Sequence, residues 1–213
     1  MLGKTHHAGG TLAALVAFEV LRNKGLLIPD CNEFIQLLVM YPFASFGSIF
    51  SDLDHGPDSI PSKDPLAMGI NKILRLTGAK HRSWQTHSIL FTGGCCALMF
   101  GLLTLFSLLY SNQYLMEIAI LRLVLLGFIC GIGSHLLLDA FTTTGIFIFP
   151  GLKLRFVPKT STFATGGTWE KIIFWLLIIG IVILFIKIFI VEGLWVWCQP
   201  LILKIKEIIG VLL

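Results

Sequence analysis

The chain has 213 residues, of which 55% are hydrophobic and only 13% are charged, and its mean hydropathy is +0.86. Soluble domains contain about 25% charged residues, so this composition excludes a water-soluble globule, and it also excludes a disordered chain, which needs low hydrophobicity and high charge. The net charge of +4 is small and the basic residues form no block, so we expect no nucleic-acid binding.

Apolar runs of about 20 residues, long enough to cross about 30 Å of hydrocarbon, indicate an all-α, polytopic membrane protein. In chain order, about five transmembrane helices are expected, at residues 8–22, 33–50, 88–110, 117–141 and 172–191. Pro42 should kink or break the second helix, because proline lacks a backbone N–H and its ring clashes with the preceding turn. We expect one integral-membrane domain over residues 1–213, with an apolar tail at 194–213 that is either an interfacial helix or a sixth span.

Two long polar loops, at residues 51–87 and 142–170, separate the predicted spans. If successive spans alternate in direction, both loops lie on one side of the membrane, together with the start of the first span and the end of the fourth. All six histidines fall on that side, at His6, His7, His55, His81, His87 and His135. Loops of this length commonly carry function, so the site is expected there. The N-terminal MLGKTHHAGG has no cleavage site and is not expected to be a signal peptide.

Histidine nitrogens and carboxylate oxygens on this side suggest a metal site, because they are the ligands of zinc, manganese and iron(II). His135 and Asp139 are four residues apart, so on a helix they share one face, and ionisable groups inside a span are costly and mark functional sites. Asp52 and Asp54 repel each other unless a cation or a shared proton lies nearby. Taken singly, an aspartate can simply cap a turn, and a histidine can form a hydrogen bond at the membrane interface. For His7 we favour this structural role over metal binding.

Four motifs, TH near the N-terminus, SDLDH, HRSWQTHS and SHLLLDAFTTTG, resemble in sequence and order those of the YdjM-like family of membrane-bound metal-dependent hydrolases. The same family is labelled LexA-binding, inner-membrane-associated hydrolases. The resemblance covers residues 5 to about 170. The sequence departs from the family at Ser51, where proline is usual, and between HR and THS, where three residues replace two. By position, the family motifs fall on His6, Asp52, Asp54, His55, His81, Arg82, Thr86, His87, His135, Asp139, Thr142 and Gly145, with Glu170 at a later acidic position.

The resemblance implies a membrane-embedded hydrolase that acts on a phosphoester or lipid-linked substrate through metal-activated water. One or two divalent ions are expected, zinc first, with manganese or iron as alternatives. The expected metal ligands are His6, Asp52, His87, His135 and Asp139. The expected catalytic residues are Asp54, His55, His81 and Arg82. The expected substrate-binding residues are Arg82, Thr142, Thr144, Lys153 and Arg155, since arginine offers a planar fork for phosphate, and lysine and threonine add charge and hydroxyl donors.

Ten of the 16 lysines and arginines lie on the predicted metal side, whereas the loops on the other side carry three, Arg22, Lys24 and Arg122. The positive-inside rule therefore places the site on the cytoplasmic face of the inner (plasma) membrane, in contact with membrane lipid. Two other functions remain open. One is a non-catalytic, metal-stabilised protein that recruits a regulatory partner; the other is a metal transporter, which would hold its ligands near the midplane. On the far side, Glu19 and Arg122 either pair, tying the first and fourth spans together, or reach the interface separately.

Overall fold

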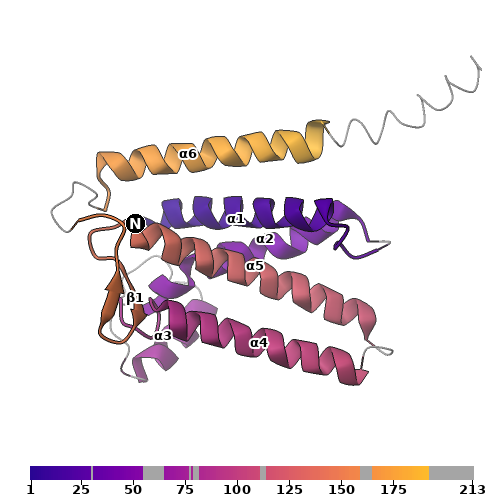
Figure 1. The fold of residues 1–213 in the computed structure, drawn as a ribbon, viewed down its shortest axis with the longest axis horizontal. Coiled ribbons are helices and arrows are strands. Elements are labelled where there is room, and N and C mark those ends of the chain that lie inside the picture. Colours follow the sequence, from indigo (N-terminus) through magenta and orange to yellow (C-terminus); the bar gives the residue numbers. More distant parts are fainter. Residues whose placement is uncertain are drawn as a thin grey trace, which may run out of the picture.

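The computed structural model describes residues 1–29, 31–54, 65–76, 78, 82–110, 114–158 and 165–191. The helices are α1 (Gly3–Asn23), α2 (Glu33–Phe50), α3 (Pro65–Leu76), α4 (Ile89–Tyr110), α5 (Leu115–Ala140) and α6 (Thr168–Phe185). A 3-10 helix, η1 (Ser51–Asp54), follows α2, and a π-helical segment, η3 (Ile186–Val191), extends α6. Strands β1 (Ile146–Phe149) and β2 (Leu152–Leu154) form an antiparallel hairpin at one end of the helices (Figure 1). The predicted tail at 194–213 lies outside the described residues.

The predicted helical membrane fold is confirmed. Four helices of the described ranges are long and apolar enough to cross a membrane, over Glu33–Leu53, Ile89–Tyr110, Leu115–Ala140 and Thr168–Ile190. The first predicted span, residues 8–22, is helical as α1 but is not among these four. Its charged and imidazole side chains make α1 less apolar, and α1 packs against α2, α5 and α6 (Figure 1).

The second helix continues through Pro42 as one 18-residue element, so the predicted break is not seen. Proline at this position removes one backbone hydrogen bond, the one that would reach the carbonyl of Leu38. Neighbouring helices stabilise such interruptions in membrane proteins. On either side of the proline, Met40 and Ala44 are completely buried, so tertiary packing holds this part of α2 in place.

Glycines bring α2 and α5 into very close contact. A Cβ atom at Gly127 would lie 2.3 Å from the carbonyl oxygen of Met40, and one at Gly131 would lie 2.2 Å from that of Ala44. The four-residue spacing of these glycines is the small-xxx-small pattern of closely packed membrane helices. Because the two backbones nearly touch, the end of α2 and the end of α5 are held side by side, and the candidate site lies there.

Replacing Gly131 by alanine is therefore expected to destabilise the protein by about 1–3 kcal/mol, because the α2 backbone must move to admit the methyl group. Thermal unfolding in detergent measures this as a lower Tm. Gly133 is a matched control on the same helix, since a Cβ there meets nothing within 4 Å. Gly133→Ala should leave Tm unchanged or raise it. Equal Tm values for the two variants would contradict the proposed helix contact.

The hairpin fixes the ends of α4 and α5. The Phe147 N–H donates to the carbonyl of His87 at 2.8 Å, and the Phe156 N–H donates to that of Ala140 at 2.9 Å. Gly145 enters the hairpin with φ of 66°, and a Cβ there would lie 2.4 Å from Arg155 Cγ. The predicted polar loop at 142–170 thus contains a structured element that anchors two helix ends beside the candidate site.

At the opposite end, Glu19 and Arg122 do not pair with each other, which was one of the two arrangements that the sequence left open. Glu19 forms an ion pair with Lys187 on η3 and lies 3.8 Å from Arg22. Arg122 instead donates to the hydroxyl of Ser107 on α4 at 3.0 Å. The physical reason is the placement of α1 against α6, which brings a lysine to Glu19 and leaves Arg122 facing α4.

Candidate metal centre

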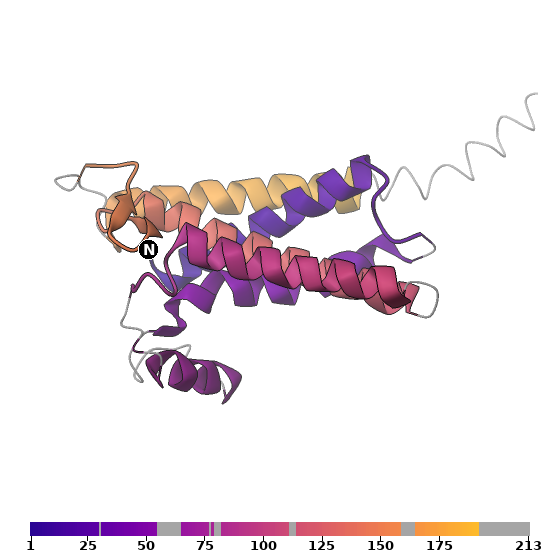
Figure 2. The same cartoon turned by 60° about the horizontal axis from the view of Figure 1, so that its bottom comes forward.

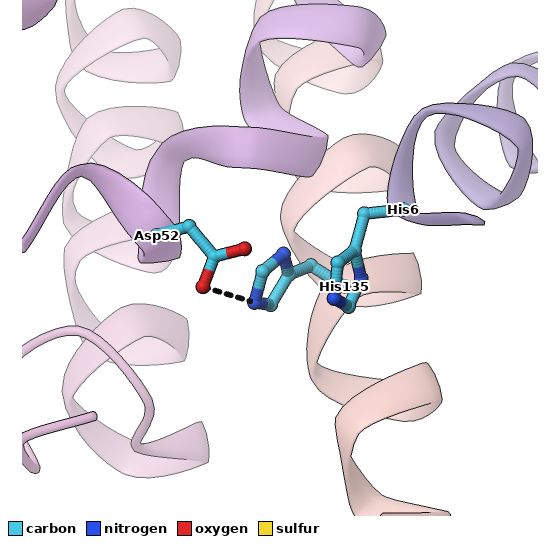
Figure 3. A group of neighbouring side chains, drawn as sticks. All are labelled: His6, Asp52 and His135. Carbon is cyan, nitrogen blue, oxygen red and sulfur yellow. Dashed lines mark ion pairs between the residues drawn. The ribbon is translucent and has the colours of Figure 1, made fainter. Parts of the chain in front are cut away.

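Five side chains from four separate segments meet at one end of the helices. His6 comes from the first turns of α1, Asp52 from η1 after α2, His87 from just before α4, and His135 and Asp139 from the last turns of α5. Figure 3 shows His135 with Asp52 on one side and His6 on the other. These are the five residues that the sequence predicts as metal ligands, and the structure brings all of them together; we name them the five-residue cluster.

The donor atoms of the cluster converge. His87 Nε2 lies 3.7 Å from both Asp52 Oδ1 and Asp139 Oδ2, and His135 Nε2 lies 3.8 Å from the same two oxygens. His6 Nε2 lies 3.3 Å from Asp139 Oδ1, and its ring stacks on the ring of His135 with centroids 3.8 Å apart. Two sets of three donors are close enough to hold a metal ion. They are His6, Asp52 and His135, and His87, His135 and Asp139.

Hydrogen bonds fix which ring nitrogen of His135 and of His87 points into the five-residue cluster. His135 Nδ1 lies 2.6 Å from the carbonyl oxygen of Ser48; because a carbonyl only accepts, the proton is on Nδ1 and the lone pair is on Nε2. His87 Nδ1 lies 3.0 Å from the hydroxyl oxygen of Thr86, which itself donates to the Ser83 carbonyl. Both rings therefore present Nε2 to the cluster, as metal-binding histidines do when an outer partner orients them.

Burial makes a cation the natural complement of this site. His6, His135 and Asp139 have no exposed surface, while the Asp52 side chain is 14% exposed. A buried carboxylate or imidazole is costly unless it is paired or binds a metal, and His135 Nε2 has no hydrogen-bond partner among the described residues. Ligand distances of 2.0–2.2 Å place the donors of a tetrahedral zinc site about 3.3–3.6 Å apart. The observed separations of 3.7–3.8 Å therefore fit a divalent ion after a small contraction.

Two positive groups already contact Asp139. The Arg82 guanidinium Nη2 lies 3.1 Å from Asp139 Oδ2, and the amino group of Met1 lies 2.8 Å from Oδ1. Arg82 has φ of 55°, a backbone conformation that costs a non-glycine residue about 1–3 kcal/mol and clusters at functional sites. Its side chain is 18% exposed, so Arg82 lies at the open edge of the cluster.

The other predicted substrate-binding residues lie on the loop and hairpin. The Thr142 hydroxyl donates to the carbonyl of Asp139 at 2.7 Å, so Thr142 caps α5. Arg155 Nε donates to the carbonyl of Thr144, and Lys153 Nζ lies 4.6 Å over the Phe147 ring. Among the predicted catalytic residues, Asp54 ends η1, whereas His55 and His81 lie outside the described residues.

His7 and Glu170 support the surroundings of the cluster. His7 Nδ1 lies 3.0 Å from the Ser45 hydroxyl, away from the cluster, and burial together with the neighbouring His6 lowers the pKa of His7. Glu170 accepts hydrogen bonds from the Thr5 hydroxyl at 2.9 Å and from the backbone N–H of Leu2. It thereby ties the start of α6 to the turn that carries His6. The family motif marks Glu170, but its structural role depends on helix packing that the sequence does not reveal.

Replacing Thr86 by valine should weaken metal binding about 10- to 100-fold, the usual effect of losing an outer partner of a ligating histidine. The change keeps the shape of the side chain but removes the oxygen that faces His87 Nδ1. A competition titration with a zinc-binding dye measures the affinity. Thr104→Val is the matched control, because the Thr104 hydroxyl donates only to the carbonyl of Phe100 on the exposed side of α4. Equal affinities in the two variants would contradict an orienting role for Thr86.

A family model described as "YdjM inner membrane protein" matches residues 1–203, nearly the whole chain. No curated protein and no solved structure matches the chain significantly.

Proposed function

The chain belongs to the YdjM inner membrane protein family, and from the site at the end of its helices we propose that it is a membrane-embedded, metal-dependent hydrolase of phosphoesters. The observation that supports this most directly is the buried convergence of three histidines and two aspartates, with Arg82 at its open edge. Histidine and carboxylate donors suit zinc, followed by manganese and iron(II).

The geometry favours one ion at a time. Both donor sets use His135, and its Nδ1 is engaged with the Ser48 carbonyl, so only Nε2 is available to a metal. The two sets are therefore alternative, overlapping parts of one site. One set adds His6 and Asp52 to His135, and the other adds His87 and Asp139 to it.

The chemistry that a bound divalent ion supplies here is the activation of water as a nucleophile near neutral pH. The chain provides the remaining functions. Asp52 and Asp139 supply the negative charge that holds the cation, while Ser48 and Thr86 keep the two imidazoles in the binding tautomer. The Arg82 guanidinium can bind two phosphate oxygens with its planar fork and stabilise charge that develops on them. Asp54 follows Asp52 by two residues and is proposed as an outer ligand or general base.

A structural metal site in a protein that recruits a regulatory partner is the second candidate. Complete burial of His6, His135 and Asp139 favours it, because structural sites are closed and filled by protein ligands. The partial exposure of Asp52 and Arg82 favours the hydrolase, since substrate needs an open edge.

We place the site on the cytoplasmic side. Basic residues gather at this end, among them Lys4, Arg82, Lys153 and Arg155, as the positive-inside rule expects of the cytoplasmic face. Cys31 lies at the opposite end, in the turn before α2. Labelling of Cys31 by a membrane-impermeant maleimide in intact cells checks this orientation. Protection of Cys31 from the label would place the site on the opposite side of the membrane.

Two adjacent histidines provide the decisive comparison. His6→Ala is expected to lower metal content and affinity at least about 10-fold, whereas His7→Ala should match wild type, because only His6 faces the cluster. Metal is measured by elemental mass spectrometry on detergent-purified protein, and activity by phosphate release from a soluble aryl phosphate monoester or diester. Wild-type protein should hold about one equivalent of metal, and a chelator should abolish hydrolysis. Absence of metal after reloading would refute the proposal, whereas bound metal without hydrolysis would favour the structural alternative.

A further inference from the structure

An apolar groove of about 770 Å³ lies between α2, α4 and α5, within the membrane-spanning part of the protein. Its walls include Phe43 and Phe46 from α2, Met99 and Leu102 from α4, and Phe128 from α5. Phe43, Met99 and Leu102 are 39%, 50% and 57% exposed, so the groove opens sideways, towards the lipid. Its volume falls within the range of about 300–1,000 Å³ that is usual for ligand pockets.

The groove is aligned with the five-residue cluster along the helix axes. Phe46 precedes Asp52 by six residues and Phe128 precedes His135 by seven, so the near end lies about 10 Å from the cluster at 1.5 Å per residue. Met99 follows His87 by twelve residues, which puts the far end about 20 Å away. Figure 2 shows α4 running along α5 from the cluster end to the far end. A flexible chain attached to a group at the cluster can therefore extend into the groove.

The two exposed residues at the cluster belong to the segments that adjoin two of the groove's helices. Asp52 and Arg82 are 14% and 18% exposed, whereas the side chains of the four other cluster residues are at most 1% exposed. Asp52 directly follows α2 and Arg82 precedes α4, the two helices that flank the groove. Arg82 and the basic hairpin residues Lys153 and Arg155 give this end the charge that complements an anionic head group.

We propose that the groove binds one acyl chain of an anionic phospholipid, whose phosphate lies at the edge formed by Asp52 and Arg82. The inference rests on the proposed function and names its substrate class. In the reaction, the oxygen of water bonds to phosphorus, the phosphoester P–O bond breaks, and the departing oxygen takes the proton that water loses. The apolar groove selects for a long chain, and the cluster acts only on the head group.

A photoreactive lipid tests this assignment. The probe is phosphatidic acid with a diazirine halfway along one acyl chain, incorporated with the full-length protein into dioleoylphosphatidylcholine vesicles. After illumination, mass spectrometry locates the labelled residues. Label should be at least 5-fold higher on groove residues than on Leu108, which faces away on α4 and is 77% exposed. Leu102→Trp should reduce groove labelling at least 5-fold, because the indole fills a groove wall that is exposed and needs no repacking. Leu108→Trp is the matched control and should leave labelling unchanged.

The outcomes separate this inference from the proposed function. Even labelling of all lipid-facing residues, or equal labelling in the Leu102 and Leu108 variants, overturns the acyl-chain site. Metal content and hydrolysis of the soluble aryl phosphate are measured on the same samples. If both persist while the labelling is even, only the groove assignment fails. If metal and hydrolysis are absent while the groove is labelled selectively, the hydrolase fails and the lipid-binding groove stands.

Discussion

Replacing Asp139 by asparagine is expected to remove the bound metal and reduce phosphoester hydrolysis to background. Asp139 is completely buried, and its two oxygens lie within 3.8 Å of His6, His87 and His135. The amide keeps the size of the side chain but removes the negative charge that offsets a divalent cation in a buried site. The loss of affinity should exceed the roughly 10- to 100-fold effect of an outer-shell change. Elemental mass spectrometry and phosphate release measure the two effects.

Glu117→Gln is the control for Asp139→Asn. Glu117 is an exposed carboxylate in the first turn of the same helix, α5, at the far end of the spans. The Glu117→Gln protein should retain full metal content and activity. Thermal unfolding of both variants separates loss of metal from loss of fold, because Arg82 also contacts Asp139. A folded Asp139→Asn protein with wild-type metal content would contradict the assignment of Asp139 as a ligand.

Replacing Arg82 by alanine is expected to lower kcat/KM for phosphoesters by about 100- to 1,000-fold, the usual effect of removing one group that stabilises transition-state charge. Metal content should stay near wild type, because the five donors remain. Arg82→Lys should recover little activity, since an ammonium group cannot bind two phosphate oxygens in a plane. Steady-state hydrolysis and elemental mass spectrometry together give the result.

Arg82→Gly separates the backbone of Arg82 from its side chain. Arg82 has φ of 55°, which glycine adopts without strain. The glycine variant should therefore fold at least as well as the alanine variant and be equally inactive. Arg75→Ala, which removes an exposed cation from α3, should keep wild-type kcat/KM. Equal activities of the Arg82 and Arg75 variants would show that Arg82 contributes only general positive charge.

Hydropathy alone was sufficient to predict α2, α4, α5 and α6, because 20-residue apolar runs have few alternatives to a membrane helix. The prediction was less accurate where packing overrides local preference. Pro42 lies within a continuous helix, and Glu19 pairs with Lys187 in place of Arg122. Both outcomes depend on which helices are neighbours, and that information is not contained in any single segment.

The sequence by itself determined the membrane class and the family. The resemblance to that family's motifs implied the five clustered residues, and alternating spans place those motifs on one side of the membrane. Only the tertiary structure decided how these residues meet. The close contact at Gly127 and Gly131 sets Asp52 beside His135, and the Ser48 carbonyl fixes the His135 tautomer. The tertiary structure also decided that α2 and α4 leave a groove between them. The physical reason is that hydropathy is a property of each segment, whereas a donor geometry or a groove is a property of the contacts between segments.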